Sequence, residues 1–337
     1  MTQPLRAVVD MSGRRFDEIF SAADQQRLRD TVEVVWGRDE PMPDAEAAEA
    51  LEEAEILICS QWRYGALSGR YPKLRAIIDV GGGLPRGLDY TEVFARGIHV
   101  LTAAPGFGRQ VAEMALGLAI ASCREIPIGD RAMRAGTEQH LHHGNETTFM
   151  LFDKPIGIIG YGGIAQALHP LLVPFGGEIL AYDPWLGDGY LRSRGVKPVG
   201  LEELLSESKF IFVLAAPSSE NKAVLDREML ELIAPDAVLL LISRAHVADF
   251  DALTELLAAG RFRAGIDVFP EEPMPADHPI RSIEQAVLSA HRAGSVREGM
   301  WDLGTMVVDD LEMLVRGLPP RRLQGAAREL FERLTNA

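Results

Sequence analysis

The sequence has 337 residues, 47% of them hydrophobic, so the chain is long enough to bury two cores, in keeping with ~150 residues per domain. Its net charge of −15 disfavours attraction to nucleic acid or to an anionic membrane surface, because the electrostatic field repels both. No apolar run approaches the ~20 residues of a membrane span, the first residues lack the pattern of a signal peptide, and two cysteines are too few for a disulfide framework. We therefore expect a cytoplasmic protein without nucleic-acid or membrane partners.

Strands and helices alternate through the first hundred or so residues. Polar stretches with helical spacing, among them 44–54 and the segment after Arg14, separate short apolar runs. The runs predicted as buried strands are 6–9, 32–36, 55–59 and 75–80. Such alternation is typical of a parallel sheet covered by helices, so the sequence predicts an α/β domain here.

A glycine-rich turn begins almost halfway along the chain. Residues 155–160 predict a buried strand, and residues 163–175 predict a helix. Gly160, Gly162 and Ala165 occupy the small positions of the pattern G-x-G-x-x-A at this junction. Gly160 permits the tight turn, and Gly162 lets a pyrophosphate approach the helix N-terminus, where unpaired amides favour an anion. The turn therefore predicts a dinucleotide site.

An acidic residue closes the next strand, which is predicted at 178–183. Asp183 lies 21 residues beyond Gly162, close to the ~20 residues expected for a carboxylate that binds the ribose. A carboxylate accepts hydrogen bonds from the ribose diol and repels a 2′-phosphate. NAD is therefore the predicted cofactor.

The remainder of the chain continues the α/β pattern. Residues 109–125 predict a long, mostly buried helix ahead of the glycine turn. Six strands typical of a doubly wound sheet are predicted at 155–160, 178–183, 210–215, 237–243, 263–269 and 286–290. Ser295 and Glu298 have the spacing of a capping box, which predicts a last helix up to Arg316, stopped by Gly317. Because this helix follows the final strand, its return to the first domain would make that domain discontinuous.

Five blocks of the sequence together resemble a known family. They are VAEMALGLAIASCRE, GIIGYGGIAQAL, LLISRAHVADFDAL, GIDVFPEEP and SAHRAGS, and they have the order and spacing of the NAD-dependent D-isomer-specific 2-hydroxyacid dehydrogenases. The resemblance implies two Rossmann-like domains: a flavodoxin-like substrate domain at 1–104 and 292–337, and an inserted NAD-binding doubly wound sheet at 105–291. It also implies a cleft between the domains and a homodimer built on the NAD-binding domain.

The resemblance implies three catalytic residues, Arg244, Glu272 and His291. Hydride transfer between an alcohol and a ketone requires one group that takes and returns the hydroxyl proton, and His291 suits this near neutral pH. Glu272 would fix the tautomer of the imidazole, and Arg244 would bind the substrate carboxylate and polarise the carbonyl. Each follows a predicted strand, where open α/β sheets bind ligands.

Further residues are assigned to cofactor or substrate by the same resemblance. The backbone amides of a glycine loop match those that receive the substrate carboxylate in the family; these are Gly81, Gly82 and Gly83. The alternative is a flexible turn in which glycines are needed only for their backbone angles. Asp267 matches an aspartate near the nicotinamide, and an acid at a strand end is equally suited to cap the following turn. The residues expected to contact the cofactor are Gly160, Gly162, Gly163, Ile164, Asp183, Pro217 and Asp267.

The roles of several other residues remain open. Trp62 and Arg63 follow a predicted strand and either shape the pocket, bind a second anionic group or lie on the surface. Trp301 either walls the pocket or packs a helix. Three histidines precede the glycine turn without the partner spacing of a metal site, so no metal is expected. These are His140, His142 and His143.

We therefore expect an NAD-dependent enzyme that interconverts a small 2-oxo acid and its D-2-hydroxy acid, of the glyoxylate or hydroxypyruvate reductase kind. The alternatives are an NAD(H)-sensing binding protein, like the corepressor relatives of the family, and a phosphite-type dehydrogenase. The complete set of arginine, glutamate and histidine favours an enzyme over a sensor. The pairing of Glu272 with His291 disfavours a formate-type enzyme, where glutamine is the usual partner, and leaves phosphite open.

Overall fold

Two units make up the computed structural model, which describes residues 4–215 and 224–328. Unit 1 contains residues 1–107 and 295–337, and unit 2 contains residues 108–294. The chain thus leaves unit 1 after Phe107 and returns to it after Gly294. The boundaries expected from the sequence, at 104 and 292, lie three residues ahead of the observed ones at 107 and 295.

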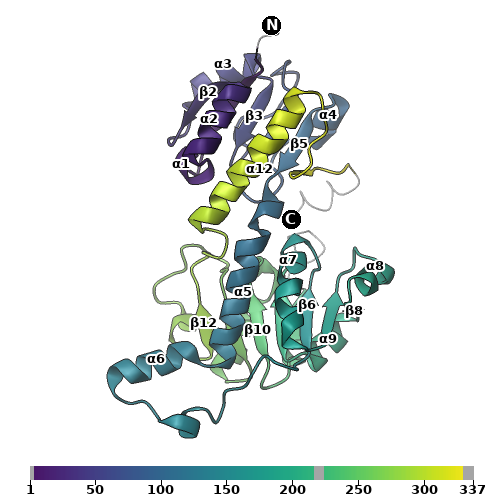
Figure 1. The fold of residues 1–337 in the computed structure, drawn as a ribbon. Coiled ribbons are helices and arrows are strands. Elements are labelled where there is room, and N and C mark those ends of the chain that lie inside the picture. Colours follow the sequence, from purple (N-terminus) through teal and green to yellow (C-terminus); the bar gives the residue numbers. More distant parts are fainter. Residues whose placement is uncertain (1–3, 216–223, 329–337) are drawn as a thin grey trace. The chain divides into compact units, whose positions relative to one another are not determined.

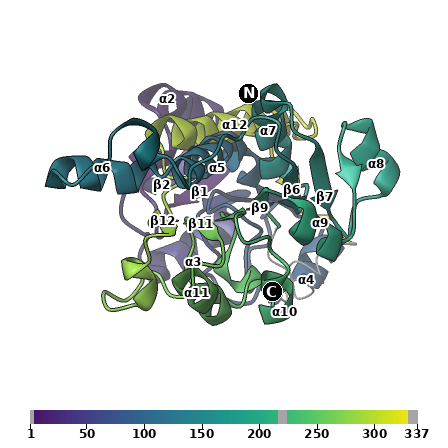
Figure 2. The ribbon, with the colours of Figure 1, turned by 90° about the horizontal axis from the view of Figure 1, so that it is seen from below.

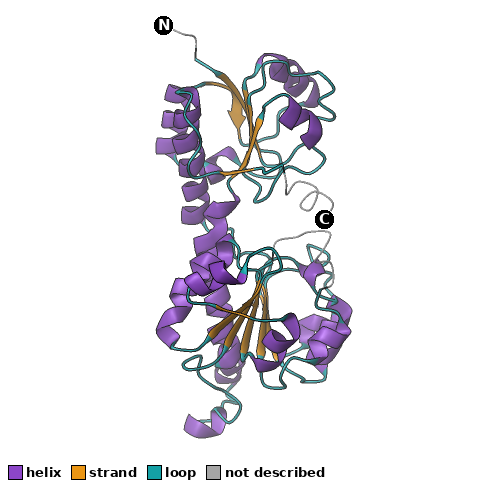
Figure 3. Cartoon of the chain, turned by 90° about the vertical axis from the view of Figure 1, so that its right-hand side faces the viewer, coloured by secondary structure: helices purple, strands orange, loops and turns teal. Residues whose placement is uncertain are grey.

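Unit 1 is built around a six-stranded sheet (Figures 1 and 3). In spatial order its strands are β13 (Gln324–Gly325), β5 (His99–Thr102), β4 (Ala76–Asp79), β3 (Ile56–Cys59), β1 (Arg6–Asp10) and β2 (Glu33–Arg38). Neighbouring strands pair in parallel, except β13, which is antiparallel to β5. Strands β1 to β5 follow the flavodoxin-like order, which confirms the predicted fold of this unit.

Alternate residues of the inner strand β1 enter two separate cores of unit 1. The helices of this unit are α1 (Phe16–Ile19), α2 (Ala22–Thr31), α3 (Asp44–Glu53), α4 (Tyr90–Ala95), the 3-10 helix η1 (Ala104–Phe107) and α12 (Arg297–Val315). Ala7 and Val9 lie in the core with α1, α2 and α12, whereas Val8 lies in the core with α3 and α4. Burial on both faces explains why the strands are continuous apolar runs in the sequence.

Unit 2 contains a seven-stranded parallel sheet. In spatial order its strands are β12 (Ala286–Leu288), β11 (Arg263–Ile266), β10 (Val238–Leu241), β9 (Phe210–Val213), β6 (Ile156–Ile159), β7 (Ile179–Tyr182) and β8 (Lys197–Pro198). The strand order reverses between β6 and β9, as in a doubly wound sheet, so the predicted fold of this unit is also confirmed. Strand β8 is an addition that the sequence did not predict.

Helices cover both faces of the second sheet. They are α5 (Gly108–Cys123), α6 (Ile126–Ala135), α7 (Gly163–Leu172), α8 (Asp188–Ser193), α9 (Leu201–Glu207), α10 (Arg227–Glu231) and α11 (Phe250–Ala258), with 3-10 helices η2 (Leu141–Gly144), η3 (Val173–Phe175), η4 (Ala245–Val247) and η5 (Pro279–Ser282). Helix α5 packs closely on β11, since a Cβ on Gly265 would lie 2.9 Å from the Cβ of Leu118. Helix α6 projects away from the body of unit 2 (Figures 1 and 2).

The capping box expected at Ser295 and Glu298 is wrong. Helix α12 begins at Arg297 with Val296 as its N-cap, and no side chain among the described residues caps its first amides. The predicted end is confirmed, because the helix stops at Val315 and Gly317 follows with a left-handed φ of 72°. None of the helices in residues 4–215 and 224–328 is long and apolar enough to cross a membrane.

Gly304 sets the distance between α12 and the end of α1. A Cβ at this position would lie 2.1 Å from the carbonyl oxygen of Ile19. We predict that Gly304→Ala lowers the free energy of unfolding by about 1–3 kcal/mol, the usual effect of forcing a methyl group into a packed core. Urea unfolding followed by circular dichroism measures this change.

The matched control is Gly117→Ala in α5, where an added Cβ would meet none of the described atoms within 4 Å outside the helix's own backbone. Replacing glycine by alanine within a helix generally raises stability by roughly 0.5–1 kcal/mol. The two variants should therefore change stability in opposite directions. A loss of the same size in both would show that the contact with Ile19 is not the cause.

Candidate active site

The glycine turn lies between β6 and α7 in unit 2. Gly160 has a left-handed φ of 85°, and a Cβ there would lie 2.4 Å from the Cα of Ala215, so only glycine fits. A Cβ on Gly162 or Gly163 would meet no described atom within 4 Å. The space beside the first amides of α7, to which Ile164 belongs, is therefore open, as a bound pyrophosphate requires.

Asp183 follows β7 directly and is hydrogen-bonded to the glycine turn. Its Oδ2 accepts the amide of Tyr161 at 2.8 Å, and its Oδ1 accepts the amides of Trp185 and Leu186 at 2.9 and 3.2 Å. These bonds fix the carboxylate at the end of the strand, next to the turn, where a cofactor ribose would lie. Pro217, which was also expected at the cofactor, lies outside the described residues.

His291 and Glu272 are in direct contact in the structure. Glu272 follows β11 and His291 follows β12, and these strands are neighbours. Nδ1 of His291 donates to Oε2 of Glu272 at 2.6 Å, while Oε1 of Glu272 accepts the amide of Phe269 at 2.9 Å. The carboxylate can only accept, so it fixes the imidazole proton on Nδ1 and leaves Nε2 for proton exchange. The two side chains are 42% and 35% exposed, so they are accessible to a substrate.

The buried carboxylate of Asp267 holds the backbone around His291. Its Oδ1 and Oδ2 accept the amides of Arg292 and Ala293 at 3.0 and 3.1 Å, and its carbonyl oxygen accepts the amide of His291 at 2.7 Å. These bonds keep His291 at a φ of 50°, a left-handed conformation that costs a residue with a side chain about 1–2 kcal/mol. Asp267 thus anchors the loop after the neighbouring strand rather than the turn after its own. Its contact with the cofactor stays a prediction.

Arg244 follows β10, the strand next to β11. The guanidinium is half-buried, and its Nη1 donates to the carbonyl oxygen of Ser243 at 2.7 Å. Strands β10, β11 and β12 are adjacent and parallel, so Arg244, Glu272 and His291 all leave the sheet at the same edge. The structure brings the histidine and the glutamate into contact and places the arginine at the end of the next strand.

In unit 1, Asp79 holds the glycine loop that follows β4. Its Oδ1 accepts the amide of Gly81 at 2.7 Å, and a Cβ on Gly81 would lie 2.2 Å from the carbonyl oxygen of Ser60. Burial raises the pKa of Asp79 to about 7, although the amides of Gly81, Gly82 and Gly83 act in the opposite direction. The Gly81 amide thus already has an acceptor within the chain. Binding of a substrate carboxylate by this loop stays a prediction.

The raised pKa of Asp79 makes stability depend on pH. Because the folded pKa of about 7 lies above the ordinary value of 3.8, the folded chain holds the proton more tightly than the unfolded chain. The stabilisation is present below pH 4 and is lost as pH rises through 7, a loss of up to about 4 kcal/mol. We predict that Asp79→Asn, which cannot ionise, gains stability relative to the wild type between pH 4 and pH 8.

Urea unfolding at each pH measures this difference. The exposed Asp30 of the same unit provides the control, because Asp30→Asn should follow the wild-type dependence on pH. Parallel curves for Asp79→Asn and the wild type would contradict the prediction.

Arg63 forms a buried ion pair with Asp10 in unit 1. Its Nε and Nη2 donate to Oδ2 of Asp10 at 2.9 and 2.6 Å, and the hydroxyl of Tyr64 donates to the same oxygen at 2.6 Å. Asp10 is fully buried, so the guanidinium neutralises a charge that has no access to water. The structure therefore favours a structural role for Arg63. Nε1 of Trp62 donates to the carbonyl oxygen of Gly65 at 2.9 Å.

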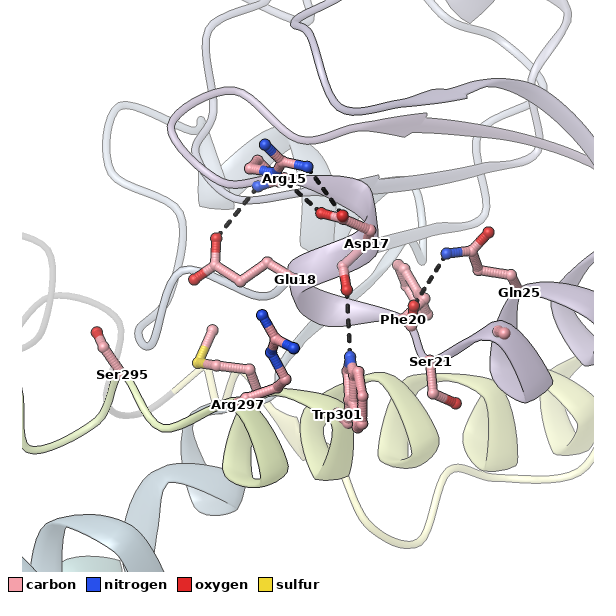
Figure 4. Close-up of a pocket in the computed structure, with 11 residues that line it drawn as sticks. Arg15, Asp17, Glu18, Phe20, Ser21, Gln25, Ser295, Arg297 and Trp301 are labelled. Carbon is pink, nitrogen blue, oxygen red and sulfur yellow. Dashed lines mark hydrogen bonds and ion pairs between the residues drawn. The ribbon is translucent and has the colours of Figure 1, made fainter.

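A cavity of about 640 Å³ lies between α1 and the start of α12 in unit 1 (Figure 4). Trp301 lines this cavity and donates its Nε1–H to the carbonyl oxygen of Asp17 at 3.1 Å. Arg15 on the opposite wall is paired with the carboxylate of Asp17 at 2.8 Å. Trp301 therefore walls a cavity and also joins α12 to α1.

The histidines ahead of the glycine turn are exposed. The rings of His142 and His143 lie 3.9 Å apart, and His140 precedes the same 3-10 helix. Within residues 4–215 and 224–328, no group of three or more histidine, cysteine, aspartate or glutamate side chains is arranged to hold a metal ion.

A doubly wound sheet, an open glycine turn and a fixed carboxylate after the second strand define a dinucleotide-binding α/β protein. Comparison with known proteins identifies the family within this class. Residues 116–293 match the NAD binding domain of the D-isomer specific 2-hydroxyacid dehydrogenases. The chain belongs to this family, and NAD(H) is its cofactor.

Individual relatives agree with this assignment. The chain is 30% identical to the D-3-phosphoglycerate dehydrogenase of Mycobacterium tuberculosis over 86% of its own length and 54% of that protein. It is 31% identical to the glyoxylate reductase of Korarchaeum cryptofilum, over 74% of the chain and 76% of the relative. The crystal structure of a phosphoglycerate oxidoreductase from Rhizobium etli is 36% identical, with a TM-score of 0.83 over 96% of this chain and 99% of that one. The chain thus spans about half the length of the curated phosphoglycerate dehydrogenases it matches.

Proposed function

We propose that the protein is an NAD-dependent dehydrogenase that interconverts a small 2-oxo acid and its D-2-hydroxy acid, of the glyoxylate or hydroxypyruvate reductase kind. The observation that carries the proposal is the 2.6 Å hydrogen bond between His291 and Glu272 at the carboxyl edge of the second sheet. Exposed imidazole–carboxylate pairs of this kind exchange protons during hydride transfer. The similarity to a glyoxylate reductase supports the substrate class.

The residues divide the chemistry in the following way. When bound, NADH supplies the hydride for C2 of the 2-oxo acid. His291 gives the proton from Nε2 to the carbonyl oxygen, so the carbonyl group becomes an alcohol and the imidazole becomes neutral. Glu272 keeps Nδ1 protonated throughout and stabilises the cationic ring before transfer. Arg244 binds the substrate carboxylate and stabilises the charge that develops on the oxygen.

The cofactor would be held by unit 2. The open amides of Gly162 and Gly163 at the start of α7 are suited to the pyrophosphate, and Asp183 is suited to the ribose diol. A fixed carboxylate at that position repels a 2′-phosphate, so NADH should bind more tightly than NADPH.

A panel of substrates tests the proposed reaction by following NADH absorbance. It contains glyoxylate, hydroxypyruvate, phosphohydroxypyruvate, pyruvate and longer 2-oxo acids for reduction, with formate and phosphite for oxidation. We predict turnover with a small 2-oxo acid. His291→Gln should lower kcat by a factor of ~10²–10⁴, and Arg244→Ala should lower it by ~10²–10³, because each removes a group that acts in the transition state.

The dissociation constant of NADH, measured by fluorescence, should be unchanged in both variants, and the exposed His143→Gln serves as a control with wild-type turnover. Wild-type turnover in His291→Gln and Arg244→Ala would reject the assigned roles. Tight NADH binding without turnover across the whole panel would instead favour an NAD(H)-sensing protein.

We also propose a cytoplasmic homodimer built on unit 2. Large apolar side chains are exposed along α6 and the segment after it, where water contact is unfavourable. These are Ile126, Met133, Leu141, Met150 and Phe152. A second copy of the chain would cover them. Both cysteines, Cys59 and Cys123, are free and buried, as expected in a reducing compartment.

Sedimentation velocity tests the dimer. We predict that the wild type sediments as a dimer and that Met133→Glu with Leu141→Glu shifts it toward the monomer, because two carboxylates would lie in the interface. The control is Leu232→Glu, which charges an exposed apolar residue after α10. A monomeric wild type, or an equal effect of the control, would contradict the proposed interface.

A further inference from the structure

Tyr161 connects the glycine turn to two other elements of unit 2. It lies between Gly160 and Gly162 and is buried. Its amide donates to Asp183 at 2.8 Å, and its hydroxyl lies 2.5 Å from Nδ1 of His169 on α7. The backbone of the residue is thereby attached to the end of β7 and its side chain to α7.

The imidazole of His169 is arranged to accept this bond. Burial lowers the pKa of His169, and the nearby cation of Arg194 lowers it further, so the neutral ring is favoured. A neutral imidazole carries one acceptor nitrogen, and a tyrosine hydroxyl is its natural donor. Burial also raises the pKa of Tyr161, which keeps the hydroxyl protonated.

A small cavity of about 310 Å³ adjoins the pair. Its lining comes from the turn, from α7, from Val173 and from the segment after α8, and consists of Tyr161, Gln166, His169, Pro170, Val173 and Arg194. Arg194 is itself hydrogen-bonded to the hydroxyl of Tyr190 at 3.2 Å. No carboxylate is among the cavity's lining residues. Helix α5, which packs on α7, carries Arg109, Glu113 and Cys123.

We propose that Tyr161 and His169 are positioning residues for the dinucleotide: their hydrogen bond fixes the peptide between Tyr161 and Gly162, so that the amides at the start of α7 face the pyrophosphate. The argument rests on the NAD-binding part of the proposed function. Glycine restricts the backbone less than any other residue, so the turn that contains Gly160, Gly162 and Gly163 has much conformational freedom of its own. The side chain of Tyr161 is the anchored group within it, so removing the anchor lets the turn leave the conformation that binds phosphate.

The proposal predicts a loss that depends on phosphate. Tyr161→Phe removes the hydroxyl and preserves the ring. It should raise the dissociation constant of NADH by about tenfold, the effect of one lost hydrogen bond at a buried site. The binding of ADP, which retains the two phosphates, should be weakened to the same extent. Adenosine, which lacks them, should bind as it does to the wild type. Fluorescence titration of NADH and competition by ADP and adenosine measure the three affinities.

Substitutions at His169 test the partner. His169→Leu should weaken NADH as much as Tyr161→Phe does, and the double variant should be no weaker than either single variant, because both remove the same bond. His169→Gln retains an acceptor and should restore most of the affinity. Tyr190→Phe, which removes a hydroxyl from the same neighbourhood without touching the turn, is the matched control and should bind NADH normally.

Three results would overturn the proposal. They are wild-type NADH affinity in Tyr161→Phe, an equal loss for adenosine, and additive losses in the double variant. If Tyr161→Phe fails to fold, the comparison of His169→Leu with His169→Gln decides in its place, since rescue by glutamine supports the bond and equal losses refute it. Failure of the wild type to bind NADH would instead reject the proposed function itself.

Discussion

The carboxylate of Asp267 holds the loop on which the contact between His291 and Glu272 depends. It is buried and accepts the amides of Arg292 and Ala293, while its own carbonyl oxygen accepts the amide of His291. A carboxylate that gains backbone hydrogen bonds in this way compensates for its desolvation. The same bonds hold His291 in a left-handed conformation that places its imidazole against Glu272. The proton transfer that we propose for His291 would thus depend on a residue that follows the neighbouring strand.

Carboxylates perform a similar task at several strand ends of this protein. Asp183 binds the glycine turn after β6, Asp79 binds the glycine loop after its own strand, and Asp10 binds Arg63 and Tyr64. In each case a loop at the carboxyl edge of a parallel sheet, where backbone amides lack a ladder partner, is fixed by an acid from the sheet. Fixed loops at this edge are what a binding site in an α/β fold requires.

Much of this arrangement was predictable from the sequence, and the failures have physical causes. The glycine turn, Asp183 and the continuous apolar strands carry local signals, because each depends on residues a few positions apart. Strands β5, β8 and β13 were missed: β8 and β13 are two-residue edge strands, and β5 has only two apolar residues, between the exposed His99 and Thr102. The capping box failed because its spacing is also compatible with a helix that begins later, at Arg297.

Contacts between residues far apart in the sequence were the other feature that could not be predicted. Arg63 and Asp10 are 53 residues apart in the sequence, and Asp267 and Arg292 are 25 residues apart. No local sequence pattern predicts either contact. An acid closing an apolar strand is the available signal for such anchors, and at Asp267 this signal was equally compatible with a contact to the cofactor and with a cap of the following turn. At Trp301 the structure shows the indole nitrogen bound to the backbone of α1 and the ring lining a cavity of unit 1, whereas a contact with the substrate pocket stays a prediction.

The interruption of unit 1 by unit 2 has a consequence for biosynthesis. Helix α12 and strand β13 belong to unit 1, yet they are translated after the whole of unit 2. Until they leave the ribosome, the apolar face containing Ala7, Val9 and Ile58 lacks the helix that shields it. Unit 2 can finish folding while unit 1 is still incomplete. The nascent chain therefore exposes an apolar, aggregation-prone face of the first sheet while the whole of unit 2 is synthesised. Its need of chaperones is greatest in that interval.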